Sequence, residues 1–512
     1  MPLHTEIEFE RDICQHLAAH GWQYAEPGAE GDARGWDTPR ALYPPDVLAW
    51  LQASQAQAWA QLSKLHGAAA EAVVLERLRK ALDEQGTLAV LRHGVELVGL
   101  KAPLKLAQFK PALAMNAELQ ARYAANRLRV LRQVRTNHDD IIDLVLCLNG
   151  VPVATAELKT DFTQDVNRAI DQYRFERLPR PKGRAQAEPL LDFPRGALVH
   201  FAVSNRTVFM TTRLLGPATR FLPFNQGDGG GAGNPPNGQG HRTAYLWEQV
   251  WQRDSWLEII GRYLVARRNA KKQVEAVLFP RYHQLDATRK LVQAVLAEGP
   301  GHRYLIQHSA GSGKTNSIAW TAHFLSELHD AQDRKVFSSV LVVSDRNVLD
   351  AQLQEAIYDF QRTTGVVASI TGNDASKSQQ LARALSGDKK IVVCTIQTFP
   401  FALAAVRELA ATQGKRFAVI ADEAHSSQTG EAASKLKQVL SSEEQQALAD
   451  GGEVSNEDIL AAHMAARAGQ DAGISYFAFT ATPKAKTLEL FGRRPRPDEP
   501  AGATNLPQAF HV

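Results

Sequence analysis

Residues 141–159 read IIDLVLCLNGVPVATAELK. Two runs of β-prone residues flank Asn149-Gly150, a pair typical of the tight turn in a β-hairpin. The register of this hairpin decides which side chains share a face. A two-residue loop would put Asp143 and Glu157 on opposite faces, whereas an odd loop or one bulge sets them opposite each other. We predict the second register, with a bulge-type turn at 149–151, because it segregates the apolar side chains from the charged ones.

In this register, Asp143, Glu157 and Lys159 share one face. Carboxylate oxygens are ligands that Mg²⁺ prefers, and a bound metal polarises a phosphodiester and acidifies a water molecule. A nearby ammonium group can hold that water or stabilise charge on the phosphate. We therefore expect Asp143 and Glu157 to bind the metal, and all three residues to be catalytic. The pattern also occurs by chance, so an ordinary charged strand edge remains an alternative.

Other polar residues surround this predicted site. Glu6 and Glu10 lie one turn apart on an expected first helix, and either could add an acidic group, although a solvated helix face is the simpler interpretation for Glu6. The basic run at residues 127–135 suits a strand that binds phosphate, with a solvated basic edge as an equal alternative. Gln172 and Tyr173 lie on a predicted helix from which they could contact a DNA backbone.

Residues 304–315, YLIQHSAGSGKT, predict a strand, a glycine-rich loop and the start of a helix. The backbone N–H groups of such a loop surround phosphate oxygens, and the helix N-terminus adds its dipole. Lys314 is expected to contact the β- and γ-phosphates, and Thr315 to ligate Mg²⁺. The strict motif has Gly where this chain has His308. The predicted nucleotide-binding residues of the loop are Ala310, Gly311, Ser312, Gly313, Lys314 and Thr315.

Residues 417–425, FAVIADEAH, predict a buried strand that ends in an acidic pair. The carboxyl end of a parallel strand is where such a sheet presents ligands. Asp422 is expected to complete the Mg²⁺ shell of a nucleotide, and Glu423 to orient or deprotonate the attacking water as a catalytic residue. Together with the phosphate loop, this pair predicts an ATP-binding site.

The composition is that of a globular multidomain protein: 512 residues, 44% hydrophobic, 22% charged, net charge +3 and three cysteines. The cysteine count fits a reducing compartment, and no run approaches the ~18 apolar residues that span a bilayer, so we expect a cytoplasmic protein without a membrane partner. Alternating apolar runs and helical stretches predict a parallel sheet in the second half. We place the domains at 1–268, with a Gly/Pro-rich loop at 225–240, and at 269–490, followed by a tail at 491–512.

The second half resembles the superfamily 2 helicases. Gln284 stands 30 residues before Lys314, in the place of the adenine-reading glutamine of that superfamily. Thr480-Ala-Thr-Pro483 resembles the motif that couples hydrolysis to DNA movement, and Ser344-Asp-Arg-Asn347 and Thr395-Ile-Gln-Thr398 follow predicted strands at places where the superfamily contacts DNA. The resemblance implies DNA-binding or coupling roles for Arg346, Gln397, His425, Thr480 and Thr482.

The spacing Asp143-x13-Glu157-x-Lys159 resembles the PD-(D/E)xK nuclease motif, and its union with a DEAH motor resembles the R subunit of type I restriction enzymes. The resemblance also rests on DRNVLDAQ at 345–352, DEAHSSQ at 422–428 and TRFLPFN at 219–225. It implies an α/β protein, with an N-terminal PD-(D/E)xK nuclease domain (a mixed sheet with flanking helices) and one RecA-like helicase lobe. It further implies ATP and Mg²⁺ as cofactors, and double-stranded DNA and the modification (methyltransferase) and specificity subunits as partners.

Two departures from the family matter. Ala169 stands where the nuclease helix of the family carries Gln ahead of Tyr173, and Gln172 could take its place. Only 29 residues follow Pro483, whereas a second motor lobe needs roughly 150. We therefore expect a truncated chain that lacks the second lobe and binds nucleotide with little coupled translocation.

Two other functions stay open from the sequence. The chain could be a fragment of a superfamily 2 helicase or remodeller whose N-terminal domain binds DNA without cleaving it, and Asp143 and Glu157 would then bind no metal. It could also be a non-enzymatic fragment that docks onto a methyltransferase core.

Overall fold

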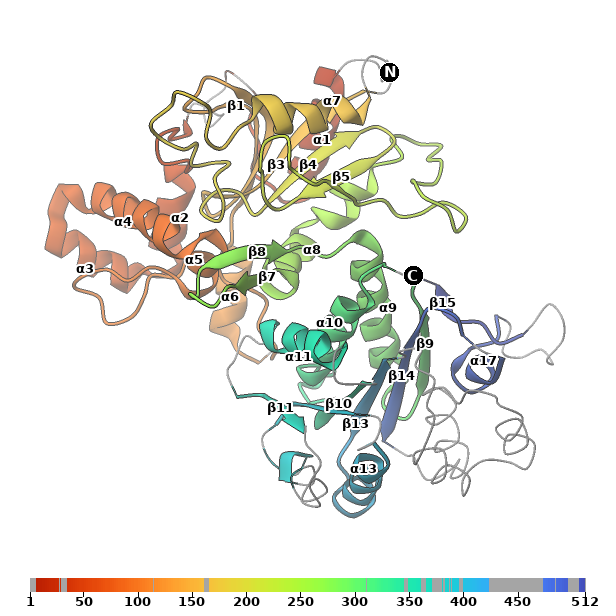
Figure 1. Cartoon of the computed structure of the whole chain (residues 1–512). Helices are drawn as coiled ribbons and strands as arrows, with labels where there is room; N and C mark the ends of the chain where they lie inside the picture. Colours follow the sequence, from red (N-terminus) through yellow and green to blue (C-terminus); the bar gives the residue numbers. More distant parts are fainter. Residues whose placement is uncertain are drawn as a thin grey trace, which may run out of the picture. The chain divides into compact units, whose positions relative to one another are not determined.

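The computed structural model divides the chain into two compact units, Met1–Tyr282 and His283–Val512 (Figure 1). No helix among the described residues has both the length and the hydropathy that a bilayer span requires. The structure describes residues 6–26, 28, 35–113, 115–160, 165–309, 311–344, 349–360, 365–370, 380, 383–385, 387, 389–395, 399–422, 473–483, 485–495 and 506–511.

The first unit contains a six-stranded sheet in the order β1-β2-β3-β4-β5-β6. β3 and β4 are parallel and the other neighbours are antiparallel, which confirms the expected mixed sheet. A crossover through α7 (Val166–Asp171) and the single π-helical turn η3 (Gln172–Glu176) joins the parallel pair. The strands are β1 (Leu128–Arg135), β2 (Ile141–Leu148), β3 (Val151–Lys159), β4 (Val199–Ser204), β5 (Val208–Thr211) and β6 (Leu222–Pro223).

The hairpin of β2 and β3 has the predicted register at the carboxylates but reaches it by another route. Asn149 and Gly150 both have positive φ, 49° and 79°, and Leu148 pairs with Val151. This is a two-residue turn of the type that Asn-Gly favours, so the predicted bulge-type turn is wrong. The register shifts instead further along β3, where Leu146 pairs with Ala154 although Cys147 pairs with Pro152. This bulge leaves Val153 as the extra residue.

Helices flank the first sheet. α1 (Glu6–Ala19) contacts β1 and β3, and it buries Phe9, Glu10, Ile13, Cys14 and Leu17 at helical spacing. A two-stranded sheet of β7 (Val265–Arg268) and β8 (Val274–Leu278) also belongs to this unit, so the unit extends past residue 268. Its other helical segments are α2 (Pro44–Ser54), α3 (Ala56–His66), η2 (Gly67–Ala69), α4 (Ala70–Gln85), α5 (Thr87–His93), α6 (Ala117–Ala125), η4 (Leu246–Val250), α8 (Arg253–Glu258) and η5 (Ile259–Tyr263).

The second unit contains a seven-stranded sheet in the order β11-β12-β10-β13-β14-β9-β15. Every pairing in it is parallel, which confirms the predicted parallel sheet. The strands are β9 (Arg303–Gln307), β10 (Ser339–Ser344), β11 (Val367–Ile370), β12 (Ile391–Thr395), β13 (Phe417–Asp422), β14 (Ile474–Thr480) and β15 (Phe510–His511). The helices are α9 (Tyr282–Glu298), α10 (Lys314–Ser326), α11 (Leu349–Asp359), α13 (Phe399–Gln413) and α17 (Ala485–Phe491).

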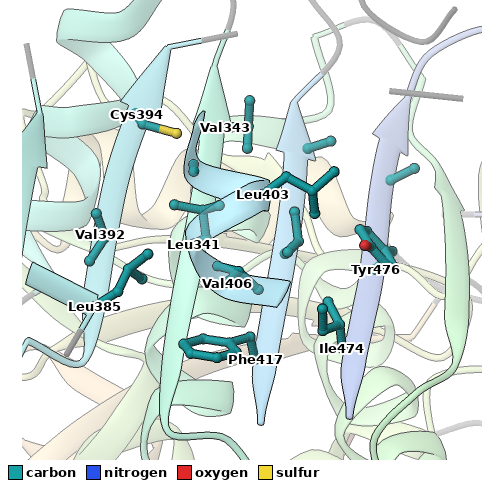
Figure 2. Packing of buried hydrophobic residues seen from close by; sticks show 14 of the residues in the cluster. Leu341, Val343, Leu385, Val392, Cys394, Leu403, Val406, Phe417, Ile474 and Tyr476 are labelled. Atoms are coloured by element: carbon teal, nitrogen blue, oxygen red, sulfur yellow. The ribbon is translucent and has the colours of Figure 1, made fainter. Parts of the chain in front are cut away.

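One core of the second unit lies between α13 and the sheet. Leu403 and Val406 of the helix pack over side chains of the strands, among them Leu341, Phe417 and Tyr476 (Figure 2). These strands are apolar along their length, as strands covered on both faces are. The sheet also includes part of the expected tail, because β15 pairs with β9 at its edge.

Candidate functional site

Asp143 and Glu157 come from neighbouring strands. Asp143 is 8% exposed and Glu157 is fully buried, and the pairing of Leu144 with Ala156 continues toward them. Asp143 Oδ2 accepts a hydrogen bond of 2.8 Å from the backbone N–H of Leu158. Burial raises the pKa of Glu157 well above its ordinary value; the negative charge of Asp143 raises it further, and the positive charge of Arg177 opposes both effects. The two acids are therefore close enough to interact strongly.

Lys159 lies in the same cluster. Its Nζ atom is 2.5 Å from Glu6 Oε1 and 3.9 Å from Asp143 Oδ2, and it donates to the carbonyl oxygen of Leu158 at 2.6 Å. Glu6 therefore faces the site from α1, so its interpretation as part of a solvated helix face is wrong. The structure brings the three predicted nuclease residues together beneath the N-terminal turn of α1.

Glu10 adds a further carboxyl group. It is 2% exposed, and it accepts hydrogen bonds of 2.9 Å from Arg132 Nε at Oε2 and from Gln133 Nε2 at Oε1. The Gln133 amide also lies 3.3 Å from Asp143 Oδ1 and so links the two acids. Burial, and next the charge of Asp143, raise the pKa of Glu10 to about 7. The helical spacing had marked Glu10 as a candidate, whereas nothing in the sequence marked Gln133.

Arg177 is the second functional residue that sequence reasoning missed. It follows η3, and its Nε atom donates to Glu157 Oε1 at 2.9 Å, while its NH1 atom lies 3.4 Å from Asp140 Oδ1. This contact supplies a positive charge to the buried Glu157. The sequence gives little indication of this contact, because Arg177 follows the irregular π-helical turn η3 rather than a regular helix.

Of the four arginines in the basic run at residues 127–135, three bind buried carboxylates, whereas Arg135 is exposed at the end of β1. Arg127 and Arg129 both bind the buried carboxylate of Asp46, with Nε–O distances of 2.8 and 2.5 Å. Arg132 binds Glu10. Arg129 and Arg132 are buried in these ion pairs, so neither phosphate binding nor a solvated edge describes them. The solvated-edge alternative fits Arg135.

Tyr173 cannot contact a DNA backbone, and this prediction is wrong. Its side chain is fully buried, because η3 turns it toward the sheet. The Tyr173 hydroxyl lies 2.7 Å from Thr155 Oγ1, which in turn lies 2.8 Å from His200 Nδ1. Burial lowers the pKa of His200 to about 3, so this imidazole is neutral. Gln172 is partly exposed, and its Oε1 atom is buried without a hydrogen-bond partner.

The donor set fits a divalent cation bound by two carboxylates. Glu157 Oε2 is buried without a hydrogen-bond partner, and Asp143 carries the neighbouring charge. A shared proton, the neighbouring Arg177 and Lys159, or a bound metal cation can each offset the repulsion between two such acids. In the part of the chain that the structure describes, no group of three or more His, Cys, Asp or Glu side chains could hold a metal ion. A cation here would therefore complete its shell with water or with phosphate oxygens.

The phosphate loop of the second unit connects β9 to α10. Gly311 and Gly313 have φ values of 75° and 85°, in the left-handed region that favours glycine. Lys314 begins α10, and its Nζ atom lies 2.9 Å from Asp422 Oδ1 at the end of β13. Thr315 follows in the first turn of α10. Loop, lysine and aspartate thus meet at the carboxyl ends of the parallel strands.

Gln284 contacts the backbone of this loop. The residue is 3% exposed, and its Nε2 atom donates to the carbonyl oxygen of Gly313 at 3.0 Å and lies 3.4 Å from that of Ser312. A Cβ atom at Gly313 would lie only 2.6 Å from this amide, so a side chain there would displace Gln284 from the loop. The φ of 85° at Gly313 also favours glycine.

The remaining motor residues divide into two groups. Thr480 is buried at the end of β14, and its Oγ1 atom accepts a 3.2 Å hydrogen bond from the backbone N–H of the exposed Thr482. The other predicted site residues lie outside the described residues: Ala310, Arg346, Gln397, Glu423 and His425.

Two family models match the chain. Residues 4–218 match the type I restriction enzyme R protein N terminus, and residues 283–449 match the SWI2/SNF2 ATPase. The two matches fall in the first and second units respectively. Among curated proteins, none matches the chain significantly.

Three solved structures are also similar to parts of the chain. The Hef helicase domain of Pyrococcus furiosus has 16% identity and a TM-score of 0.24, covering 39% of this chain and 34% of its own. A nuclease-deletion mutant of the Type ISP restriction-modification enzyme LlaGI, in complex with a DNA substrate mimic, has 20% identity and a TM-score of 0.24. The match covers 40% of this chain and 17% of that chain. UvsW of T4 has 13% identity and a TM-score of 0.26, and the match covers 44% of this chain and 34% of that chain. The chain thus spans about a third or less of these solved chains.

Proposed function

We propose that this chain, which joins the N-terminal region of a type I restriction enzyme R protein to a SWI2/SNF2-type ATPase region, acts as the motor and endonuclease subunit of a type I restriction enzyme. Its substrate would be double-stranded DNA and its cofactors ATP and Mg²⁺. Modification and specificity subunits would be its partners, and a cytoplasmic location would follow from this function.

One observation carries the nuclease part of this proposal: Asp143, Glu157 and Lys159 converge in one buried cluster. The Asp143 and Glu157 carboxylates would hold Mg²⁺, which when bound would polarise the scissile phosphodiester and acidify a water molecule. Lys159 would place its ammonium group beside that phosphate and stabilise the charge that develops on it. Because Lys159 contacts Glu6 at 2.5 Å, this contact must weaken as DNA enters.

The motor part rests on Lys314 and Asp422. Their 2.9 Å ion pair holds the lysine where the phosphates of a nucleotide would compete for it. We propose that Lys314 exchanges Asp422 for the β- and γ-phosphates, while Asp422 and Thr315 share the magnesium ion of the nucleotide. Gln284 would hold the phosphate loop in place by donating to the backbone carbonyl groups of Ser312 and Gly313. Gln172, Thr480 and Thr482 keep their proposed DNA-binding or coupling roles.

DNA cleavage by the assembled enzyme tests the proposal. The chain would be combined with its modification and specificity subunits and given ATP, Mg²⁺ and a DNA that carries the recognised site. Asp143→Asn and Lys159→Met should each reduce cleavage by at least about 100-fold, because one removes a metal ligand and the other a phosphate-stabilising charge. Neither substitution should change the rate of ATP hydrolysis from that of the unaltered chain, whatever that rate is.

Asp139→Asn provides the matched control. Asp139 lies in the turn before β2, its side chain is 77% exposed, and its φ of 65° suits asparagine equally well. This variant should cut DNA as the unaltered chain does. Undiminished cleavage by Asp143→Asn would instead show that the cluster is not the nuclease centre.

A further inference from the structure

We infer that His308 is a positioning residue of the nucleotide site, which turns the hydroxyl group of Ser312 toward the phosphates of a bound nucleotide. The inference rests on the proposed nucleotide binding and adds a residue to it. His308 occupies the place where the strict phosphate-loop motif has glycine, so that motif has no side chain at this position.

His308 is anchored between β14 and the loop. It is fully buried, and its backbone N–H donates to the carbonyl oxygen of Thr480 at 2.7 Å. Its Nδ1 atom lies 2.8 Å from Ser312 Oγ. The ring lies 6.0 Å from the rings of both His283 and Phe479. The imidazole is therefore held from several sides, with one nitrogen aimed at the loop.

The surroundings of the ring determine which nitrogen carries its proton. Burial, and then electrostatic repulsion from His283 and Lys314, lower the pKa of His308 to about 4, so the ring is neutral and has one N–H group. Nε2 is buried without a hydrogen-bond partner. A proton on Nε2 would leave a buried donor unsatisfied, whereas a proton on Nδ1 is donated to Ser312 Oγ. The geometry thus favours Nδ1–H as donor and Ser312 Oγ as acceptor.

This direction of donation fixes what the serine can do. Once Ser312 Oγ accepts from His308, its own hydrogen must point away from the imidazole. Ser312 stands between Gly311 and Gly313, and its carbonyl oxygen already accepts from His283 Nε2 at 2.9 Å. In a loop of this type the N–H groups surround phosphate oxygens, so the serine hydroxyl becomes an additional donor to the same oxygens.

The affinity of the full-length chain for ADP in the presence of Mg²⁺, measured by calorimetry, tests the inference. His308→Phe keeps a ring but removes the donor, and Ser312→Ala removes the hydroxyl group. Each should weaken ADP binding about tenfold, the effect of one hydrogen bond to a charged group. The double variant should bind no more weakly than either single variant, because both remove one interaction. His308→Asn, whose amide can donate near the position of Nδ1, should restore most of the affinity.

Each outcome decides a separate point. If the unaltered chain binds no ADP, or binds as tightly after Lys314→Ala, the proposed nucleotide site itself fails. If the unaltered chain binds and Ser312→Ala binds equally well, or if the two losses add in the double variant, the role of His308 is refuted. Should His308→Phe fail to fold, as a thermal unfolding scan would reveal, Ser312→Ala and His308→Asn still decide the matter.

Discussion

At the scale of single residues, the first unit concentrates acidic groups where water is scarce. Asp143, Glu157 and Glu10 are each less than 10% exposed, although burial disfavours the charged form of a carboxyl group. Arg132, Gln133 and Arg177 donate hydrogen bonds to Glu10 or Glu157. Such a cluster costs folding free energy, and a bound cation would offset that cost.

Glu10→Gln should change how the stability of the first unit depends on pH. The folded pKa of Glu10, about 7, lies above its ordinary value of 4.5, so the folded state binds the proton more tightly than the unfolded state. The proton on Glu10 therefore stabilises the folded state fully below about pH 4.5, and this stabilisation is lost as the pH rises through about 7. The loss in the free energy of unfolding is on the order of 3 kcal/mol, at 1.36 kcal/mol per pKa unit.

Urea unfolding followed by tryptophan fluorescence measures this, because seven of the eight tryptophans lie in the first unit. The unaltered chain should lose stability relative to Glu10→Gln between pH 4.5 and 7.5 in the absence of divalent metal. Parallel pH curves for the two proteins would contradict the assignment of a raised pKa to Glu10.

At the scale of elements, the β2–β3 hairpin separates what the sequence could predict from what it could not. The segregation of apolar and charged side chains predicted the register at Asp143 and Glu157, because that register alone buries one clean apolar face. The position of the bulge could not be predicted, because a two-residue turn with a bulge near Val153 gives the same register at Asp143 and Glu157 as a bulged turn does. The turn packs against Tyr43 and Val47. These residues lie far from the hairpin in the sequence, so no local pattern reveals the contact.

The sequence also could not predict which side chains contact the acids of the site. Arg177 and Gln133 reach the acids through a crossover and a neighbouring strand, and no local pattern encodes these contacts. Tyr173 was misjudged because η3 is a π-helical turn, which shifts the buried face relative to an ordinary helix. The phosphate loop, by contrast, follows from consecutive residues, so its strand, loop and helix could be placed from the sequence.

Gly150→Ala should destabilise the first unit strongly. Gly150 has a φ of 79°, and a Cβ atom there would lie 2.4 Å from the carbonyl oxygen of Tyr43 and 2.6 Å from Val47 Cγ2. Gly183 has the same φ of 79° with no atom within 4 Å of such a Cβ, so Gly183→Ala is a control for backbone strain alone. We expect a loss of about 1–2 kcal/mol for Gly183→Ala and at least about 3 kcal/mol for Gly150→Ala, where a steric clash adds to the strain.

Urea unfolding of both variants, again followed by tryptophan fluorescence, provides the comparison. Equal losses for the two glycines would mean that the turn does not pack against Tyr43 and Val47 as described.

At the scale of the whole molecule, two chemical centres are built on separate frameworks. The described residues of the carboxylate cluster all belong to Met1–Tyr282, and those of the nucleotide site all belong to His283–Val512. Each parallel or mixed sheet supplies strand ends to one centre only. We therefore expect each centre to bind its ligand with side chains of its own unit.

Substitutions in the two units should act independently on binding. Asp143→Asn should leave the dissociation constant of ADP unchanged within about twofold, and Lys314→Ala should leave Mn²⁺ binding at the first unit equally unchanged, because sites without shared contacts behave additively. Calorimetric titrations with ADP and with Mn²⁺ would measure both constants. A change of tenfold or more in either cross-experiment would mean that the two centres are coupled in the free chain.

The central claim is that Asp143 and Glu157 together bind a divalent cation beside Lys159. Anomalous diffraction from crystals grown with Mn²⁺ tests it most directly, because the ion can be located without reference to activity. We predict one strong peak between the carboxyl groups of Asp143 and Glu157, which disappears in Asp143→Asn crystals. A map without that peak, or a peak that survives the substitution, would contradict the account and leave a helicase-type chain whose N-terminal unit only binds DNA.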